Sequence, residues 1–441
     1  MNLRKYITNI SSLQVFQLLR FGTLLLISIV FAKSSLSTDA IGRYEFFLFV
    51  VALFSSFWIN GLIQAFLPLY KNNKSFENKT VRSPEIFNAW LLISFLTLLI
   101  ILVLLIFNRL LAELLTSKNS FPYLQLVLLY IFFVSPAYLI EYIYLLKNRP
   151  HSILKYGFTV FPLQFVLVSL PAILGHGIEY CLAGLVVSAF LRYLWLLVLL
   201  KKYALLSFSG SFIREHLHYG YPLILTTFLG ASANYIDGFL VLNRFDSSTF
   251  AIFRYGAKEF PLVLLMANAL SNAMIPEFSQ KGNFSTSLSA LRKKSKTLMH
   301  LLFPITIGFM ILSPWLYPII FSTDFVESAV IFNIYLLLIT SRLLFPHSLL
   351  IGMKKTKIIL YASVAEFFIN ISLSLIFIGF WGIRGVAFAT VIAYASQKII
   401  WLIYNNVKLK IPSNSYMPVN LHILYSALTL VVFTITYLLY F

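Results

Sequence analysis

Long apolar stretches separated by short polar segments recur from one end of the chain to the other. A hydrocarbon core roughly 30 Å thick needs about 20 apolar residues per helix, and the sequence has thirteen stretches that approach or exceed this length. We therefore expect thirteen membrane-spanning helices, at residues 13–32, 44–70, 87–107, 121–146, 153–174, 178–200, 217–243, 249–275, 298–321, 327–351, 358–380, 384–405 and 420–440.

Composition supports a polytopic membrane protein that is almost entirely helical. Hydrophobic residues make up 59% of the 441 residues and charged residues only 11%, and a water-soluble domain of this size could not bury so much apolar side chain. Little chain remains for a soluble catalytic domain. The sequence also has no phosphate-binding glycine loop and no His-Glu-x-x-His motif. We expect neither an enzyme nor a bound cofactor or metal.

The net charge of +19 follows a topological pattern. If the N-terminus is cytoplasmic, most of the 34 Lys and Arg residues fall on that side, including Arg4, Lys5, Arg292–Lys296 and Lys354–Lys357. By the positive-inside rule this predicts a multi-pass protein of a bacterial inner membrane with a cytoplasmic N-terminus. Basic loops of this kind suit lipid headgroups, so nucleic acid is not an expected partner. The opposite side has few basic residues: Lys33, Arg43, Arg109, Lys118, Arg244 and Arg384.

Two short repeats suggest that the helices form related halves. Ala-Ile-Gly-Arg-Tyr at Ala40–Tyr44 precedes the second apolar stretch, and Ala-Ile-Phe-Arg-Tyr at Ala251–Tyr255 opens the eighth. Gly-Ile also precedes both the sixth and the twelfth stretches, at Gly177 and Gly382. A shift of six helices preserves orientation, which predicts two six-helix lobes related by a pseudo-two-fold axis normal to the membrane. The predicted boundaries are 1–210 for the first lobe, 211–410 for the second and 411–441 for an extra C-terminal helix.

Ionisable and polar residues inside the apolar stretches mark candidate functional positions, because burying such groups in a membrane costs several kcal/mol. The eighth stretch places a cationic and polar stripe on one helical face. Membrane cations outnumber the carboxylates available to them, and a guanidinium matches phosphate with its forked donors. We therefore expect a substrate with an anionic headgroup. The candidate substrate-binding residues are Arg20, Arg43, Arg192, Arg254, Lys258, Arg342, Asn268 and Asn272.

Three membrane carboxylates, Asp237, Glu366 and Glu141, are candidates for coupling transport to a proton or cation, or for neutralising the arginines in one conformation. Two other interpretations stay open for the polar positions. In the first, the polar side chains form helix-to-helix hydrogen bonds and internal ion pairs that fix the packing. In the second, which applies to Arg43 and Arg192 near helix ends, the side chains extend to the lipid headgroups.

Two stretches resemble the C-terminal half of bacterial polysaccharide flippases of the multidrug/oligosaccharidyl-lipid/polysaccharide exporter superfamily, with the O-antigen flippases as the nearest match. The stretches are residues 219–276, which contain Gly220-Tyr221-Pro222, and 352–397, which contain Gly382-Ile383-Arg384-Gly385. The resemblance implies alternating access and an undecaprenyl-pyrophosphate-linked sugar repeat carried from the cytoplasmic to the periplasmic leaflet. It also implies that Arg20, Arg43 and Arg254 matter for transport. The thirteenth helix departs from the even count usual in that family.

Two other function classes remain. A drug or cation exporter of the same superfamily would have a more acidic and aromatic cavity. A membrane-embedded sugar polymerase or transferase typically carries a long periplasmic loop, and no predicted outside loop is that long. The expected partners are the lipid-linked oligosaccharide and membrane lipid, with a polysaccharide polymerase as a further candidate.

Overall fold

The computed structural model describes residues 9–70, 82–116, 121–279 and 284–441. Arg4, Lys5 and Lys118, which contribute to the predicted topology, lie outside the described residues. Within the described ranges the regular structure is helical, without a strand, and eleven helices are long and apolar enough to cross a membrane. The prediction of an all-α polytopic membrane protein is therefore confirmed.

The chain forms two compact units, each with its own apolar core. The first comprises Met1–Ala231 with Asp246–Ser248, and the second comprises Ser232–Phe245 with Thr249–Phe441. One long helix, α10 (Gly210–Arg244), contributes to both.

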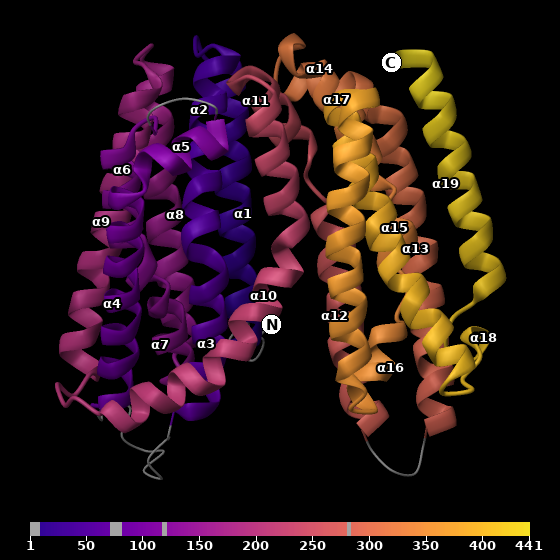
Figure 1. Cartoon of the computed structure of the whole chain (residues 1–441), viewed down its shortest axis with the longest axis horizontal. Helices are drawn as coiled ribbons and strands as arrows, with labels where there is room; N and C mark the ends of the chain where they lie inside the picture. The colour runs from indigo at the N-terminus through magenta and orange to yellow at the C-terminus, as the bar shows by residue number, and fades with distance from the viewer. Residues whose placement is uncertain (1–8, 71–81, 117–120, 280–283) are drawn as a thin grey trace, which may run out of the picture. The chain divides into compact units, whose positions relative to one another are not determined.

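In the first unit, α1, α4, α6, α8 and α9 run side by side (Figure 1). Helix α1 packs on α8, and α9 packs on both α8 and α6. Local sequence sets several helix starts: the Ser37 hydroxyl accepts a hydrogen bond from the Ala40 amide at 3.2 Å, and prolines occupy the first turn of α4 and α8. The other elements of this unit precede α10 and have these bounds: α1 (Asn9–Lys33), α2 (Thr38–Val51), the π-helical turn η2 (Ala52–Ser56), α3 (Phe57–Leu69), α4 (Pro84–Ile106), α5 (Asn108–Thr116), α6 (Leu124–Ala137), α7 (Leu139–Leu146), α8 (Pro150–Ile173) and α9 (Ile178–Tyr203).

In the second unit, α13 packs against α12, α14 and α19, and α16 packs against α12 and α17. The elements that follow α10 are α11 (Ser247–Gly256), α12 (Pro261–Ser279), α13 (Phe284–Ile320), the 3-10 turn η3 (Thr323–Phe325), α14 (Val326–Leu336), α15 (Ile339–Arg342), α16 (Pro346–Gly352), α17 (Thr356–Val407), α18 (Ser413–Tyr416) and α19 (Val419–Tyr440).

Helix α17 folds back on itself as two antiparallel arms. Gly382 has φ +57° inside it, a conformation that glycine adopts without steric cost. Across the turn, the Asn370 side chain donates to the Thr390 hydroxyl at 3.0 Å, and Gly385 lies against the carbonyl of Phe377. The two arms correspond to the helices predicted at 358–380 and 384–405.

The eighth and tenth apolar stretches, residues 249–275 and 327–351, were each predicted as one continuous helix, and each is interrupted in the structure. Helix α11 ends at Gly256 and α12 begins at Pro261, so the predicted single stripe from Arg254 to Asn272 is divided between two helices. The tenth stretch divides into α14, α15 and α16, and α16 begins at Pro346. Proline cannot donate the backbone hydrogen bond that would continue the preceding helix, and it favours the first helical turn. The second and fourth stretches, six places earlier in the order of predicted helices, are also irregular: η2 interrupts the second, and the fourth divides into α6 and α7 around Tyr138.

Candidate functional site

In the first unit, two of the predicted arginines gather around Tyr138. The guanidinium carbon of Arg20, on α1, lies 5.5 Å from the centroid of the Tyr138 ring, and that of Arg192, on α9, lies 5.9 Å from the same centroid. These distances are within the range of cation–π attraction. Tyr138 stands at the junction of α6 and α7, so the interruption of the fourth stretch positions the ring that both cations contact.

Arg192 is buried and makes only some of the hydrogen bonds that its guanidinium could make. Its side chain is buried, and its Nε donates to the hydroxyl of Tyr156 at 2.9 Å. Glu141, also buried, is close enough to attract it electrostatically. Within the described part of the chain, Nη2 of Arg192 and Oε2 of Glu141 are buried without a hydrogen-bond partner. By contrast, Arg20 is exposed, so this cluster of Arg20, Tyr138, Glu141, Tyr156 and Arg192, the N-unit cluster, joins an exposed cation to a buried one.

Arg43 lies apart from this cluster, in the first turns of α2. It forms an ion pair with Asp39, and its Nη1 is 3.3 Å from the hydroxyl of Tyr123. The Tyr123 hydroxyl in turn donates to Glu179 at 2.7 Å, and burial raises the pKa of this phenol. The arginine is therefore held in a chain of polar contacts between helix ends, which fits the helix-end interpretation of Arg43.

In the second unit, Arg342 has a carboxylate partner that the sequence analysis did not identify. Its Nε and Nη2 donate to the two carboxylate oxygens of Glu259 at 2.9 and 2.5 Å. Its guanidinium carbon also lies 4.4 Å from the ring centroid of Tyr394. The expected excess of cations over carboxylates therefore does not hold at Arg342. The signal that could have indicated Glu259 is the charged pair Lys258-Glu259, which stands before Phe260 and Pro261 in a mostly apolar stretch.

The remaining predicted substrate-binding residues lie along the interrupted eighth stretch. Arg254 is half-buried in α11, and the half-buried Lys258, in the segment between α11 and α12, places its Nζ 4.8 Å from the ring centroid of Tyr255. Asn268 and Asn272 are exposed four residues apart on α12, and hence on the same helical face. The structure thus keeps the two amides together on one exposed face.

Asp237 is the centre of a second buried cluster. Its Oδ2 accepts hydrogen bonds from the hydroxyls of Tyr335 at 2.7 Å and Thr390 at 2.6 Å. Asn370, on the opposite arm of α17, donates to the Thr390 hydroxyl. We call these residues the C-unit cluster, and we add to it the buried Ser374, which lies one helical turn from Asn370 on the same face of α17. Among the described residues, Oδ1 of Asp237, Oδ1 of Asn370 and Oγ of Ser374 are buried without a hydrogen-bond partner.

Glu366 lies on the same α17 hairpin, and its Oε2 accepts a weak hydrogen bond from the Gln397 side chain at 3.4 Å. Lys398 follows Gln397 in sequence and was not among the predicted site residues. It is buried, and its Nζ lies 4.7 Å from the centroid of the Trp401 ring. The sequence signal that could have indicated Lys398 is its position as a charged residue inside the apolar stretch 384–405. In the described residues, no group of three or more His, Cys, Asp and Glu side chains is arranged to hold a metal.

Comparison with known proteins identifies a family whose sequence pattern this chain matches. The family described as "Polysaccharide biosynthesis protein" matches residues 35–330. A comparison with curated sequences finds no match. Among solved structures, a lipid II flippase MurJ in an inward closed conformation is similar with a TM-score of 0.65 and 20% identity, over 97% of each chain.

Two transporters of the multidrug/oligosaccharidyl-lipid/polysaccharide superfamily are also similar in fold. An inward-facing multidrug resistance MATE transporter has a TM-score of 0.64 and 13% identity, over 91% of this chain and 98% of that one. A transporter of the superfamily from Pyrococcus furiosus has a TM-score of 0.58 and 14% identity, over 92% and 95%. At these identities the likeness shows a shared fold, and it confirms the superfamily fold indicated by residues 219–276 and 352–397.

Proposed function

Because the chain belongs to the polysaccharide biosynthesis protein family, we propose that it flips an undecaprenyl-pyrophosphate-linked oligosaccharide repeat, of an O-antigen or related surface polysaccharide, from the cytoplasmic to the periplasmic leaflet. The proposed setting is a bacterial inner membrane, with the N-terminus cytoplasmic. The fold shared with a lipid II flippase supports a lipid-linked cargo, and the family description supports a glycan.

The N-unit cluster is the observation that carries this proposal. Two guanidinium groups near one tyrosine ring repel each other, and in an apolar setting that repulsion is strong. A buried carboxylate, Glu141, offsets part of this repulsion at Arg192. A pyrophosphate diester carries a negative charge on each phosphate, so it can compensate both arginines, and arginine's planar fork pairs well with phosphate oxygens. Arg20, the exposed member, is the proposed first contact and Arg192 the second.

The other predicted cations take subordinate parts in the same proposal. Arg254 and Lys258 supply further positive charge along the eighth stretch, and the exposed face of Asn268 and Asn272 offers amides to sugar hydroxyls. Arg43 assists near a helix end, where its ion pair with Asp39 moderates its charge. Arg342 is committed to Glu259, and we assign it a structural role.

We propose that the C-unit cluster couples transport to a proton or a small cation. A carboxylate oxygen, an amide oxygen and a hydroxyl oxygen are all buried without a partner in the described residues, although buried polar atoms nearly always have one. Oxygen donors of these kinds suit a hard cation, and a proton on Asp237 would also remove the unpaired charge. Glu366 and Glu141 are the other proposed coupling residues.

The test of the flippase function uses a strain that lacks the gene and makes surface polysaccharide only when the protein is supplied. Arg20→Gln is the informative variant, because the side chain is exposed and its loss leaves the packing intact. We expect surface polysaccharide to fall at least tenfold while the lipid-linked repeat accumulates on the cytoplasmic side, at unchanged protein level. Arg109→Gln is the matched control, since Arg109 is exposed and paired only with its neighbour Glu113 among the described residues.

Normal surface polysaccharide from the complete deletion would contradict the flippase function. Loss of drug resistance in that deletion would favour the drug exporter instead. A predicted partnership with a polysaccharide polymerase is tested in the same strain by asking whether the polymerase co-purifies with the intact protein.

A further inference from the structure

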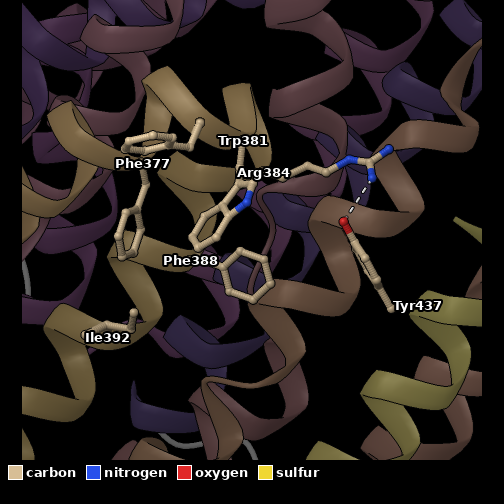
Figure 2. A pocket seen from close by; sticks show the side chains of 7 residues that line it. Phe377, Trp381, Arg384, Phe388, Ile392 and Tyr437 are labelled. Carbon is tan, nitrogen blue, oxygen red and sulfur yellow. Dashed lines mark hydrogen bonds between the residues drawn. The ribbon is translucent and has the colours of Figure 1, made fainter.

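A hollow lies on the second unit beside the turn of the α17 hairpin. Its volume is about 660 Å³, within the roughly 300–1,000 Å³ of pockets that hold small ligands. Phe377 and Trp381 come from the first arm of α17, Phe388 and Ile392 from the second, and Tyr437 from α19 (Figure 2). The lining is therefore mostly aromatic and aliphatic.

Arg384 supplies the charged group of this lining. Its Nη1 donates to the hydroxyl of Tyr437 at 3.1 Å, as the dashed line in Figure 2 shows, and its Nε lies 3.4 Å from a carboxylate oxygen of Glu327. The contact with Glu327 is long, and the Glu327 side chain is 44% exposed, so this ion pair is weak. A guanidinium has five N–H donors, and these two contacts leave donors for an anion.

The residues around the hollow are ordered by depth in the membrane. The turn of α17 and the C-terminal end of α19 lie at the same end of this unit (Figure 1). Arg384 is next to that turn, whereas Ile392 is eight residues further along the second arm, roughly 12 Å deeper at 1.5 Å per residue. Phe380 and Trp381 are exposed at 79% and 56% in an apolar helix. A cation near the turn of α17 thus stands at one end of an apolar recess, and exposed aromatic side chains of a membrane-spanning helix border that recess.

We propose that this hollow binds one anionic glycerophospholipid, whose phosphate pairs with Arg384 and whose acyl chain lies along Phe377, Phe388 and Ile392. Charge complementarity selects the headgroup: a phosphate without a nearby ammonium group gains the full attraction of the guanidinium, whereas a zwitterionic headgroup brings a second cation close to it. None of the residues that line the hollow belongs to the N-unit cluster or to the C-unit cluster.

Interfacial aromatic residues commonly contact many lipids without holding any of them, so the experiment must separate a defined site from such a belt. The full-length protein is titrated with phosphatidylglycerol or phosphatidylcholine, and bound lipids are counted by native mass spectrometry. We expect one phosphatidylglycerol to bind at least tenfold more tightly than phosphatidylcholine.

Two charge variants with opposite expected effects make the test specific. Arg384→Gln should weaken phosphatidylglycerol binding by about tenfold, as expected when hydrogen bonds to a charged group are lost. Glu327→Gln should strengthen it several-fold, because it removes the acceptor that competes for the guanidinium. Arg244→Gln, which removes an exposed cation at the end of α10, is the matched control and should leave the affinity unchanged.

Equal affinity for the two lipids, or unchanged binding in both Arg384→Gln and Glu327→Gln, would overturn the proposal in favour of an unspecific aromatic belt. Recovery of a polyprenyl lipid as the tightly bound species would overturn the assigned occupant. The flippase function is tested separately, because it is measured by surface polysaccharide and not by lipid binding.

Discussion

Arg342 donates two hydrogen bonds to the two carboxylate oxygens of Glu259, and each residue stands beside an interruption in its helix. Glu259 lies between the end of α11 at Gly256 and the start of α12 at Pro261, and Arg342 is the last residue of α15, four residues before α16 begins at Pro346. Interrupted helices leave backbone groups without their usual partners, which is tolerated in a membrane only where protein or a cavity lies alongside. The bidentate pair joins the two interruptions and so fixes their positions.

We expect Glu259→Gln to destabilise the protein by about 3 kcal/mol, because it leaves a mostly buried guanidinium without its counter-charge. Thermal unfolding of the purified protein in detergent measures the effect. Glu259→Gln combined with Arg342→Gln should recover much of the loss, since the double variant buries no unpaired charge. A double variant less stable than Glu259→Gln alone would show that the two residues act independently.

The sequence predicts the membrane spans well because each one depends on a local sum of apolar side chains. The last span, predicted at 420–440, is α19 at Val419–Tyr440. The interruption before Pro261 was not predicted, because hydropathy averaged over a span hides four irregular residues. Glu259 was missed for a related reason: it stands next to Lys258 in sequence, but its partner Arg342 is brought to it only by tertiary packing.

In both clusters, too, the sequence indicates single residues but not the contacts that tertiary packing makes between them. The sequence selected Arg20, Arg192 and Glu141 as single membrane residues, yet it gave no sign that Tyr138 brings them together, because tyrosine is common in this chain, with 25 residues. Asp237 was selected as a charged residue in an apolar helix. Its contact with Tyr335 joins residues far apart in sequence, so no spacing rule could predict it.

The hairpin of α17 depends on a glycine at its closest approach. A Cβ atom at Gly385 would meet the carbonyl of Phe377, whereas a Cβ at Gly379 would meet nothing within 4 Å. We expect Gly385→Ala to destabilise the second unit by about 1–3 kcal/mol, the usual cost of inserting a group into a packed contact, and Gly379→Ala to be neutral or slightly stabilising. Thermal unfolding compares the two. Equal effects of the two substitutions on stability would show that the close contact between Gly385 and the Phe377 carbonyl does not constrain the packing of the two arms.

Replacing Tyr138 tests whether its ring holds the two arginines. Tyr138→Phe retains a ring of nearly the same shape and should preserve transport of the lipid-linked repeat. Tyr138→Leu removes two cation–π contacts worth about 0.5–1 kcal/mol each, and should reduce the rate of transport by roughly tenfold. Appearance of surface polysaccharide after induction of the protein measures the rate. Similar losses in both variants would point to the hydroxyl instead of the ring.

Asp237→Asn tests the proposed coupling role. The substitution is nearly isosteric, and the side-chain oxygen that remains can still accept hydrogen bonds from Tyr335 and Thr390, so we expect the protein to fold and reach the membrane in normal amounts. Without a carboxylate the cluster can bind neither a proton nor a cation at this position. Transport should therefore fall at least tenfold and lose its dependence on the ion gradient, as measured in vesicles with imposed proton or sodium gradients.

Thr390→Val provides the comparison that separates coupling from packing. It removes one hydroxyl that donates to Asp237 at 2.6 Å but keeps the carboxylate, so the ion should still bind, with an affinity raised because the ionised carboxylate loses a stabilising hydrogen bond. A transport rate that saturates at a lower ion concentration, with an unchanged maximum, is the expected signature. If Asp237→Asn and Thr390→Val both lowered the amount of folded protein and left transport per molecule intact, the cluster would be a packing feature, because a coupling site must change how the rate depends on the ion.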